Sequence, residues 1–281
     1  MTRRVRVLLV DAATPLRAAI AAALGNDERF ELAGEARDGR DVVHHAVRLK
    51  PAVIAMQYDV TRFDAARATR ALLELLPVPI VLLSAAGDEA ATQTVRALAA
   101  GAVDFVLMPE KGESVLPEAA RTELAEKLLA ATQVDLTRIV RPVARSLDSA
   151  RFVGRHAARL APAPVSVLPR RRATPFRRGP TFVVLAAGAG APAALVRIVP
   201  RLRLTPEAGL LIVVHMSPAL TRALARELDD QASFPVREAL DGEPFAGGEA
   251  RMAPGGAHLV AMPGASLKLE KTPAVHGLKP S

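Results

Sequence analysis

The 281-residue chain contains no cysteine and no tryptophan, and its aromatic residues are eight Phe and one Tyr. Without cysteine there is no disulfide, no thiol nucleophile, no cysteine-bound zinc and no iron–sulfur cluster. The scarcity of aromatic rings argues against a surface on which the bases of single-stranded nucleic acid would stack. We therefore expect a core built mainly from Ala, Val and Leu, and nothing in the composition indicates an oxidising compartment.

Long apolar runs are also missing from the sequence. None reaches the length of about 18 to 20 residues that spans a bilayer, and the first residues show no secretory signal. Hydrophobic residues make up 50% of the chain and charged residues 23%, which is the balance of a globular protein. The length predicts roughly two domains. We expect a cytoplasmic protein with no membrane span.

Positive charge is concentrated in one segment. Residues 138–178 contain eleven Arg, no Lys and one acid, Asp148, and so carry +10, whereas the whole chain carries +8 and the remainder therefore about −2. The segment also contains five prolines, so we predict an Arg- and Pro-rich linker over residues 132–180. A basic linker can bind nucleic acid or an anionic membrane surface. A solvated tether is the favoured interpretation, and nucleic-acid binding is the weaker alternative.

The first half of the chain alternates between strand and helix patterns. Val5–Val10 is an uninterrupted apolar run that ends at Asp11, as in a parallel strand buried on both faces. Further strands are predicted at residues 30–35, 52–56, 79–83 and 103–107, and helices at 15–25, 40–49, 64–76, 88–100 and 117–131. This alternation predicts a doubly wound α/β domain with a five-stranded parallel sheet, whose ligand crevice lies at the carboxyl ends of the strands.

Three phrases in this half, VRVLLVDAATPLRAAI, VPIVLLSA and RALAAGAVDFVLMP, resemble a bacterial response-regulator receiver domain. The last phrase is typical of the chemotaxis protein-glutamate methylesterase family (CheB). The resemblance implies a flavodoxin-like receiver domain over residues 1–131. It also implies a phosphoryl-accepting aspartate, an acidic pair for Mg²⁺, a hydroxyl residue and a lysine at the strand ends.

The receiver positions depart from that pattern. Asp11 matches the first acid of the pair, but Ala12 stands at the second, and Ser84 matches the hydroxyl residue. Gln57 occupies the acceptor position, and Met108 replaces the lysine. Because an amide cannot form an acyl phosphate, we expect no phosphorylation, and Asp11, Ser84 and Met108 are interpreted as remnants of the receiver site. No metal and no cofactor are expected.

The second half again alternates between strand and helix. We predict strands at 181–186 and 210–215, a turn of small residues at 187–191, and helices at 192–204 and 217–228. The phrases FVVLAAGAGAPAAL, IVVHMSPALTRALAREL, VREALDGEPFAGG, MAPGGAHL and HGLKPS follow the order of the methylesterase catalytic domain. Residues 181–281 thus resemble its first half, and we expect a partial, C-terminally truncated α/β methylesterase-like domain.

The resemblance implies an acyl-enzyme mechanism with a Ser-His-Asp arrangement. Gly188 occupies the position of the serine nucleophile, and glycine has no side-chain oxygen, while His215 matches the catalytic histidine. The family's aspartate lies beyond the region equivalent to this chain. Ser217 and Thr221 follow His215 closely, but helix capping and placement on a helix surface account for them better than a role as a substitute nucleophile.

These residues support one favoured hypothesis and two others. The favoured hypothesis is a degenerate, noncatalytic member of the chemotaxis methylesterase family that acts by protein binding in signal transduction, with a chemoreceptor, another signalling protein or a sensor-kinase array as its partner. The alternative is an active protein-glutamate methylesterase and protein-glutamine deamidase of chemoreceptors with an unrecognised nucleophile. A degraded gene product without a stable function is the third. Whether the chain is an enzyme stays open at this point.

Overall fold

The computed structural model describes residues 4–11, 15–37, 39–59, 64–109, 115–136, 181–188, 190–275 and 279–280. Met1–Val140 and Pro180–Ser281 belong to one compact unit, which contains all the described residues. From residue 137 onward, the predicted linker lies outside the described residues, and its boundaries stay a prediction. None of the helices in the described part of the chain combines the length and hydropathy of a membrane span.

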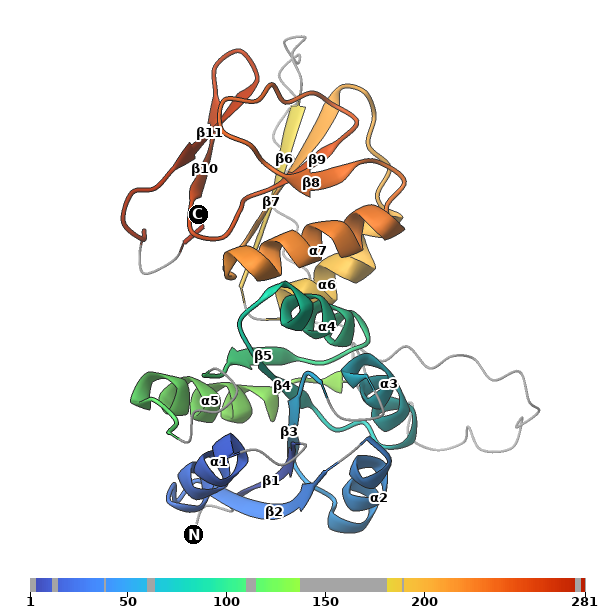
Figure 1. Cartoon of the computed structure of the whole chain (residues 1–281). Coiled ribbons are helices and arrows are strands. Elements are labelled where there is room, and N and C mark those ends of the chain that lie inside the picture. The colour runs from blue at the N-terminus through green and yellow to red at the C-terminus, as the bar shows by residue number, and fades with distance from the viewer. Residues whose placement is uncertain are drawn as a thin grey trace, which may run out of the picture. The chain divides into compact units, whose positions relative to one another are not determined.

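The first sheet has five parallel strands in the order β2-β1-β3-β4-β5, which is the flavodoxin-like order and confirms the predicted fold class (Figure 1). Its strands are β1 (Val5–Val10), β2 (Phe30–Ala36), β3 (Val53–Gln57), β4 (Ile80–Ser84) and β5 (Asp104–Leu107). The helices between and after them are α1 (Pro15–Gly25), α2 (Gly39–Leu49), α3 (Ala65–Leu75), α4 (Asp88–Ala99) and α5 (Glu118–Ala131). β1 and α1 have the predicted bounds, and the ends of the other elements differ from the predicted ones by at most one residue.

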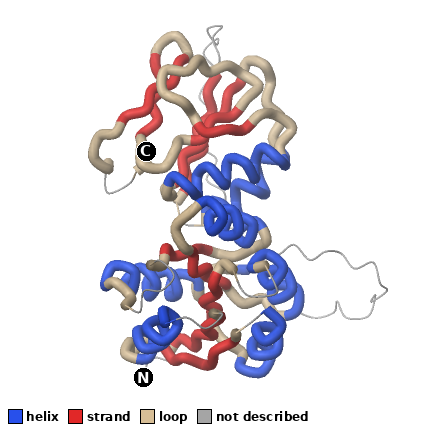
Figure 2. Tube along the Cα trace, viewed as in Figure 1, coloured by secondary structure: helices blue, strands red, loops and turns tan. Residues whose placement is uncertain are grey.

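Helices cover both faces of this sheet, as Figure 2 shows by the helices, in blue, on either side of the strands, in red. Alternate strand residues point to opposite faces. Val7 and Leu9 therefore pack in the cluster that α1 and α5 cover, whereas Leu8 and Val10 pack in the cluster that α2, α3 and α4 cover. Burial on both faces explains why the strands are continuous apolar runs.

The second sheet has four parallel strands in the order β6-β7-β9-β8. The strands are β6 (Thr181–Ala187), β7 (Ala208–Val214), β8 (Val236–Glu238) and β9 (Ala250–Met252), and the helices are α6 (Ala191–Ile198) and α7 (Pro218–Gln231). α6 and α7 cover one face of β7. An antiparallel hairpin of β10 (His258–Met262) and β11 (Ser266–Glu270) supplies Leu267 to the opposite face, where it packs with Leu211 and Phe245.

Several predicted bounds in this half were wrong. β7 begins at Ala208, two residues before the prediction, and ends at Val214, so His215 lies just after the strand. α6 ends at Ile198 and continues only as the 3₁₀ turn η2 (Val199–Arg201), because Pro200 has no N–H to extend the α-helical hydrogen bonding. α7 continues to Gln231, three residues beyond the prediction, and its last turn carries a hydrogen bond from Gln231 to Glu227.

Helix α4 packs against α6 and α7 within the compact unit. Ala91 and Val95 of α4 share an apolar cluster with Leu195 of α6 and Leu224 of α7. At the rim of this cluster, Arg222 Nη1 lies 3.0 Å from Asp88 Oδ1. Both side chains of that pair are substantially exposed, so the apolar burial rather than the ion pair accounts for most of the stabilisation.

Candidate functional site

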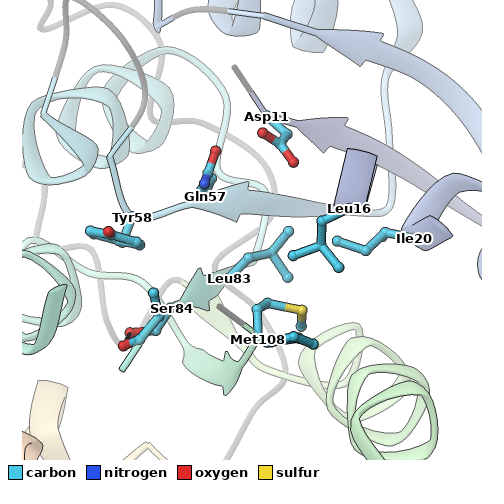
Figure 3. Close-up of a pocket in the computed structure, with 10 residues that line it drawn as sticks. Asp11, Leu16, Ile20, Gln57, Tyr58, Leu83, Ser84 and Met108 are labelled. Atoms are coloured by element: carbon cyan, nitrogen blue, oxygen red, sulfur yellow. Dashed lines mark hydrogen bonds between the residues drawn. The ribbon is translucent and has the colours of Figure 1, made fainter. Parts of the chain in front are cut away.

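The four receiver positions singled out in the sequence meet at the carboxyl edge of the first sheet. Asp11 follows β1, Gln57 ends β3, Ser84 ends β4 and Met108 follows β5. All four line one cavity of about 20 Å³ (Figure 3). A cavity of that size has room for about one water molecule. Parallel strands bring these side chains together because their carboxyl ends share one edge.

Met108 belongs to the hydrophobic core. Its side chain is only 8% exposed and shares a cluster with Leu16, Ile20 and Leu83, which line the same cavity. Figure 3 shows Met108 beside these apolar side chains. The backbone N–H of Met108 donates to the carbonyl of Ser84 over 2.7 Å, which fixes the strand end. None of the described residues that line the cavity is a lysine or an arginine.

The hydroxyl of Ser84 already has hydrogen-bond partners. Its Oγ lies 2.8 Å from Oγ1 of Thr94 on α4 and 3.3 Å from the carbonyl oxygen of Ala85. Ser84 and Thr94 are both fully buried. Since a buried hydroxyl without a partner is costly, this pair holds the end of β4 against α4.

Asp11 and Gln57 supply the polar lining of the cavity. Asp11 is buried, and Gln57 is half-buried. Ala12, at the second acidic position, lies outside the described residues. No group of three or more potential metal ligands occurs in the described ranges. One carboxylate beside Met108, in a space of this size, does not fit the Mg²⁺ ion and phosphoryl group of a receiver.

In the second half, a tight turn joins β6 to α6. The N–H of Ala191 donates to the carbonyl of Gly188 over 3.0 Å, and Gly190 has a φ of +76°. Gly190 therefore needs the conformational freedom of glycine. Gly188 does not, because its φ is not positive and a Cβ built on it would meet no atom within 4 Å. The backbone at Gly188 would accept a serine, so the missing hydroxyl is not imposed by the turn.

His215 lies at the start of the loop from β7 to α7, and its ring is held by the chain's last residues. Nδ1 accepts a hydrogen bond from the backbone N–H of Lys279 over 2.9 Å. A neutral imidazole carries one proton, so the ring that accepts this bond at Nδ1 is assigned its proton on Nε2. A general base for acyl transfer accepts the nucleophile's proton at Nε2, and the tautomer of His215 leaves no lone pair there.

The turn and the histidine come together at one cavity of about 280 Å³. From the second half, its lining includes Gly188, Gly190, Pro192, Val214, His215 and Met216, and from β5 and α5 it includes Asp104, Phe105, Glu123 and Lys127. The Lys127 ammonium donates to the carbonyl of Phe105 over 2.6 Å and pairs with Glu123 over 2.8 Å. The charge of Lys127 at this cavity is thus already neutralised by Glu123.

Of the two residues weighed as replacement nucleophiles, Ser217 lies where the sequence predicted it and Thr221 does not. Ser217 does stand at the N-cap of α7, but its side chain makes no capping hydrogen bond. Thr221, expected on the helix surface, is fully buried instead. Its hydroxyl donates to Glu238 over 2.6 Å and accepts from the N–H of Gly255 over 2.9 Å. Thr221 therefore ties the β9–β10 loop to α7, whereas Ser217 lines a cavity with His215.

The sequence pattern missed Lys279 and Thr94 as partners of the predicted site residues. Lys279 acts through its backbone N–H, which every residue except proline carries, so no side-chain pattern could indicate it. Thr94 lies ten residues after Ser84, inside helix α4. The helical period indicates that this position is buried, but not that its hydroxyl binds Ser84.

These features define a class: an α/β protein with a receiver-type sheet and a second parallel sheet that carries a strand–turn–helix site. A family model for CheB methylesterase matches residues 183–281. A protein-glutamate methylesterase/protein-glutamine glutaminase of Symbiobacterium thermophilum is 35% identical over 288 residues, which cover 99% of this chain and 75% of that protein. The chain belongs to the CheB family of protein-glutamate methylesterases.

A second relative agrees with that assignment. The protein of the same description from Pyrococcus abyssi is 30% identical over 282 residues, which cover 99% of this chain and 72% of that protein. Among solved structures, the response regulator domain of Thermotoga maritima CheB is 30% identical and matches 47% of this chain and 99% of that domain, with a TM-score of 0.42.

Proposed function

We propose that this chain is a noncatalytic member of the protein-glutamate methylesterase family that acts by binding a protein partner in signal transduction. The observation that carries the proposal is Gly188 at an exposed turn whose backbone would accept a serine. Without a hydroxyl at this turn, no acyl-enzyme forms there. The hydrogen bond from Lys279 to Nδ1 of His215 supports the same conclusion, because it places the ring in the wrong tautomer for a base.

The receiver half supports a constitutive binding role. Gln57 cannot accept a phosphoryl group. Met108, a core side chain, stands at the position where the family has a lysine. We therefore propose that the binding does not depend on phosphorylation. The division into a receiver-like domain (1–131), a linker (132–180) and a methylesterase-like domain (181–281) is part of this proposal.

The ligand we propose is a protein segment that carries a glutamyl methyl ester or a glutamine, since these are the groups named in the relatives' activities. The partner that we propose to carry these groups is a chemoreceptor helix. The cavity beside Gly188 and His215 is the proposed binding site, with Met216 and Pro192 as its apolar lining and the Nε2–H of His215 as a donor to a carbonyl oxygen.

The test is titration calorimetry of the full chain with a methylated chemoreceptor segment. We expect saturable binding that Gly188→Phe abolishes by filling the cavity. The matched control is Gly25→Phe, since Gly25 also has open space around its Cβ and no positive φ but lies at the end of α1. Absence of binding by the unaltered chain, or equal binding by Gly188→Phe, would reject the proposed site.

A further inference from the structure

The loop between β9 and β10 lies directly against the backbone that follows His215. A Cβ built on Gly255, in this loop, would lie 2.4 Å from the backbone nitrogen of Pro218, so the two backbones are in contact. The N–H of Gly255 donates to Oγ1 of Thr221 over 2.9 Å and holds the loop on α7. The start of β10 therefore has a fixed position relative to the loop that carries His215.

The first residue of β10 is a buried histidine, His258, which is 5% exposed. Its Nε2 lies 3.0 Å from the carbonyl oxygen of Pro273. A carbonyl oxygen can only accept a hydrogen bond, so Nε2 of His258 is assigned as the donor. Because a buried polar group without a partner is costly, this bond holds Pro273 against β10.

The segment after β11 leads from Pro273 back to His215. The ammonium of Lys279 donates to the carbonyl of Thr272 over 2.8 Å, next to the residue that His258 binds. The backbone N–H of the same lysine donates to Nδ1 of His215 over 2.9 Å. His258 and Lys279 thus bind two neighbouring carbonyls, and Lys279 also supplies the donor to the ring of His215.

We propose that His258 is a positioning residue for His215. Its bond to Pro273 keeps the segment after β11 where the N–H of Lys279 meets Nδ1 of His215. The proposed function uses the Nε2–H of His215 to bind a carbonyl oxygen, and this donor then depends on a histidine outside the described lining of the cavity. The consequence for binding rests on the proposed function, whereas the hydrogen bond to His215 does not.

The test is NMR spectroscopy of the full chain labelled with ¹⁵N in its six histidines and six lysines. Spectra are recorded at about pH 8.5, because an imidazole with the usual pKa of about 6.5 is then neutral. We expect a scalar coupling between the amide nitrogen of Lys279 and Nδ1 of His215 across their hydrogen bond. His258→Leu keeps an apolar side chain but removes the donor. It should abolish the coupling and lower the exchange protection of the Lys279 N–H at least about tenfold.

Two variants and one amide serve as controls. His258→Gln is the conservative variant, because its side-chain N–H can donate to Pro273 in place of the ring, and it should restore the coupling. His44→Leu, at an exposed position on α2, should leave the coupling unchanged. The amide of Lys268 in β11, which pairs with Val260 of β10, reports whether the hairpin stays folded. Its exchange should be equal in all variants.

A separate measurement follows the consequence for binding. In the calorimetric titration with the methylated chemoreceptor segment, His258→Leu should weaken binding about two- to tenfold, as expected for one hydrogen bond, and His258→Gln should not. A chain that shows the coupling but binds no segment would reject the proposed function and still support the positioning of His215.

Three results would overturn the positioning role. The first is the absence of the coupling in the unaltered chain. The second is a coupling that persists in His258→Leu, since the bond to Pro273 would then be unnecessary. The third is an equal loss of protection at Lys268 and Lys279 in His258→Leu, which would show that His258 stabilises the hairpin and does not act on His215.

Discussion

The backbone N–H of Lys279 donates to Nδ1 of His215 over 2.9 Å, across 64 positions of sequence. In a neutral ring, this bond favours the tautomer that carries the proton on Nε2. An active acyl-transfer histidine has the opposite tautomer, with Nδ1–H donating to a carboxylate and Nε2 accepting from the nucleophile. The proposed noncatalytic function therefore rests on the ring of His215 as well as on Gly188.

Restoring the serine alone should not restore hydrolysis. Gly188→Ser adds a hydroxyl at a position where its Cβ meets nothing within 4 Å, so the variant should fold with a stability within about 0.5 kcal/mol of the unaltered chain. We expect no methanol release from a methylated chemoreceptor, because Nε2 of His215 has no lone pair to accept the serine proton. Release at a measurable rate would show that the ring can adopt the other tautomer.

The neighbouring glycine should respond differently. Gly190 has a φ of +76°, so Gly190→Ser should lower the free energy of unfolding by about 1–2 kcal/mol. Urea unfolding of the two serine variants side by side measures this difference. Equal stability of the two would mean that the turn from β6 to α6 does not require the left-handed conformation.

Met108 should resist conversion to the family's lysine. Its side chain packs with Leu16 and Ile20, so Met108→Lys buries an ammonium group among apolar atoms, and we expect a loss of about 1–3 kcal/mol. Met108→Leu keeps the volume and should cost less than about 1.5 kcal/mol. Neither variant should be labelled by acetyl phosphate, since Gln57 is an amide. Thermal unfolding and phosphoryl labelling of both variants measure the two effects.

The Ser84–Thr94 pair gives a double-variant test. Ser84→Ala leaves the buried hydroxyl of Thr94 without its 2.8 Å partner and should destabilise the chain by about 1–3 kcal/mol. Adding Thr94→Val removes the second hydroxyl with little change of shape, so the double variant should regain most of that loss. Additive losses in the two single variants and the double variant would show that the hydroxyls do not interact.

Most of the first sheet follows from local sequence, because each of its strands is an apolar run between helices of period 3.6. The strands β8 to β11 were not predicted. β8 and β9 have three residues each, which is too few to show a period. They are strands because β9 pairs with β7 and β8 pairs with β9. Arg251, in the middle of β9, is a charged residue and so gives no sequence signal of burial, yet it is 1% exposed.

Two carboxylates compensate the charge of the buried Arg251. The sequence places them close to Arg251 but does not indicate that they pair with it. Nε lies 3.0 Å from Glu243 and Nη2 lies 2.8 Å from Glu249. The sequence could likewise place Gln57, Ser84, Met108, Gly188 and His215 at strand ends. It could not indicate that Lys279 holds the ring of His215, since that contact depends on how the chain's last residues return to the second sheet.

The Glu243 carboxylate should make stability depend on pH. Burial raises the pKa of Glu243, but the N–H of Leu240 and the guanidinium groups of Arg251 and Arg237 outweigh that effect, so its pKa lies below the ordinary value of 4.5. A lowered pKa in the folded state contributes stability above the unfolded pKa, and this contribution is lost as the pH falls through the folded pKa.

Glu243→Gln should therefore destabilise the chain by about 3 kcal/mol at pH 7, because it leaves Arg251 buried with one carboxylate instead of two. The difference from the unaltered chain should shrink in acid, below the ordinary pKa of glutamate. Urea unfolding at pH 7 and pH 3 measures both values. A difference that is the same at both pH values would contradict the role of the charged carboxylate.

The most direct test of the central claim is methanol release from methylated chemoreceptors by the folded full chain, beside an active protein-glutamate methylesterase. We predict that the relative releases methanol and that this chain releases none, while circular dichroism shows it folded. Release that His215→Ala abolishes would contradict the noncatalytic account, and loss of that release in Ser217→Ala would identify the substitute nucleophile.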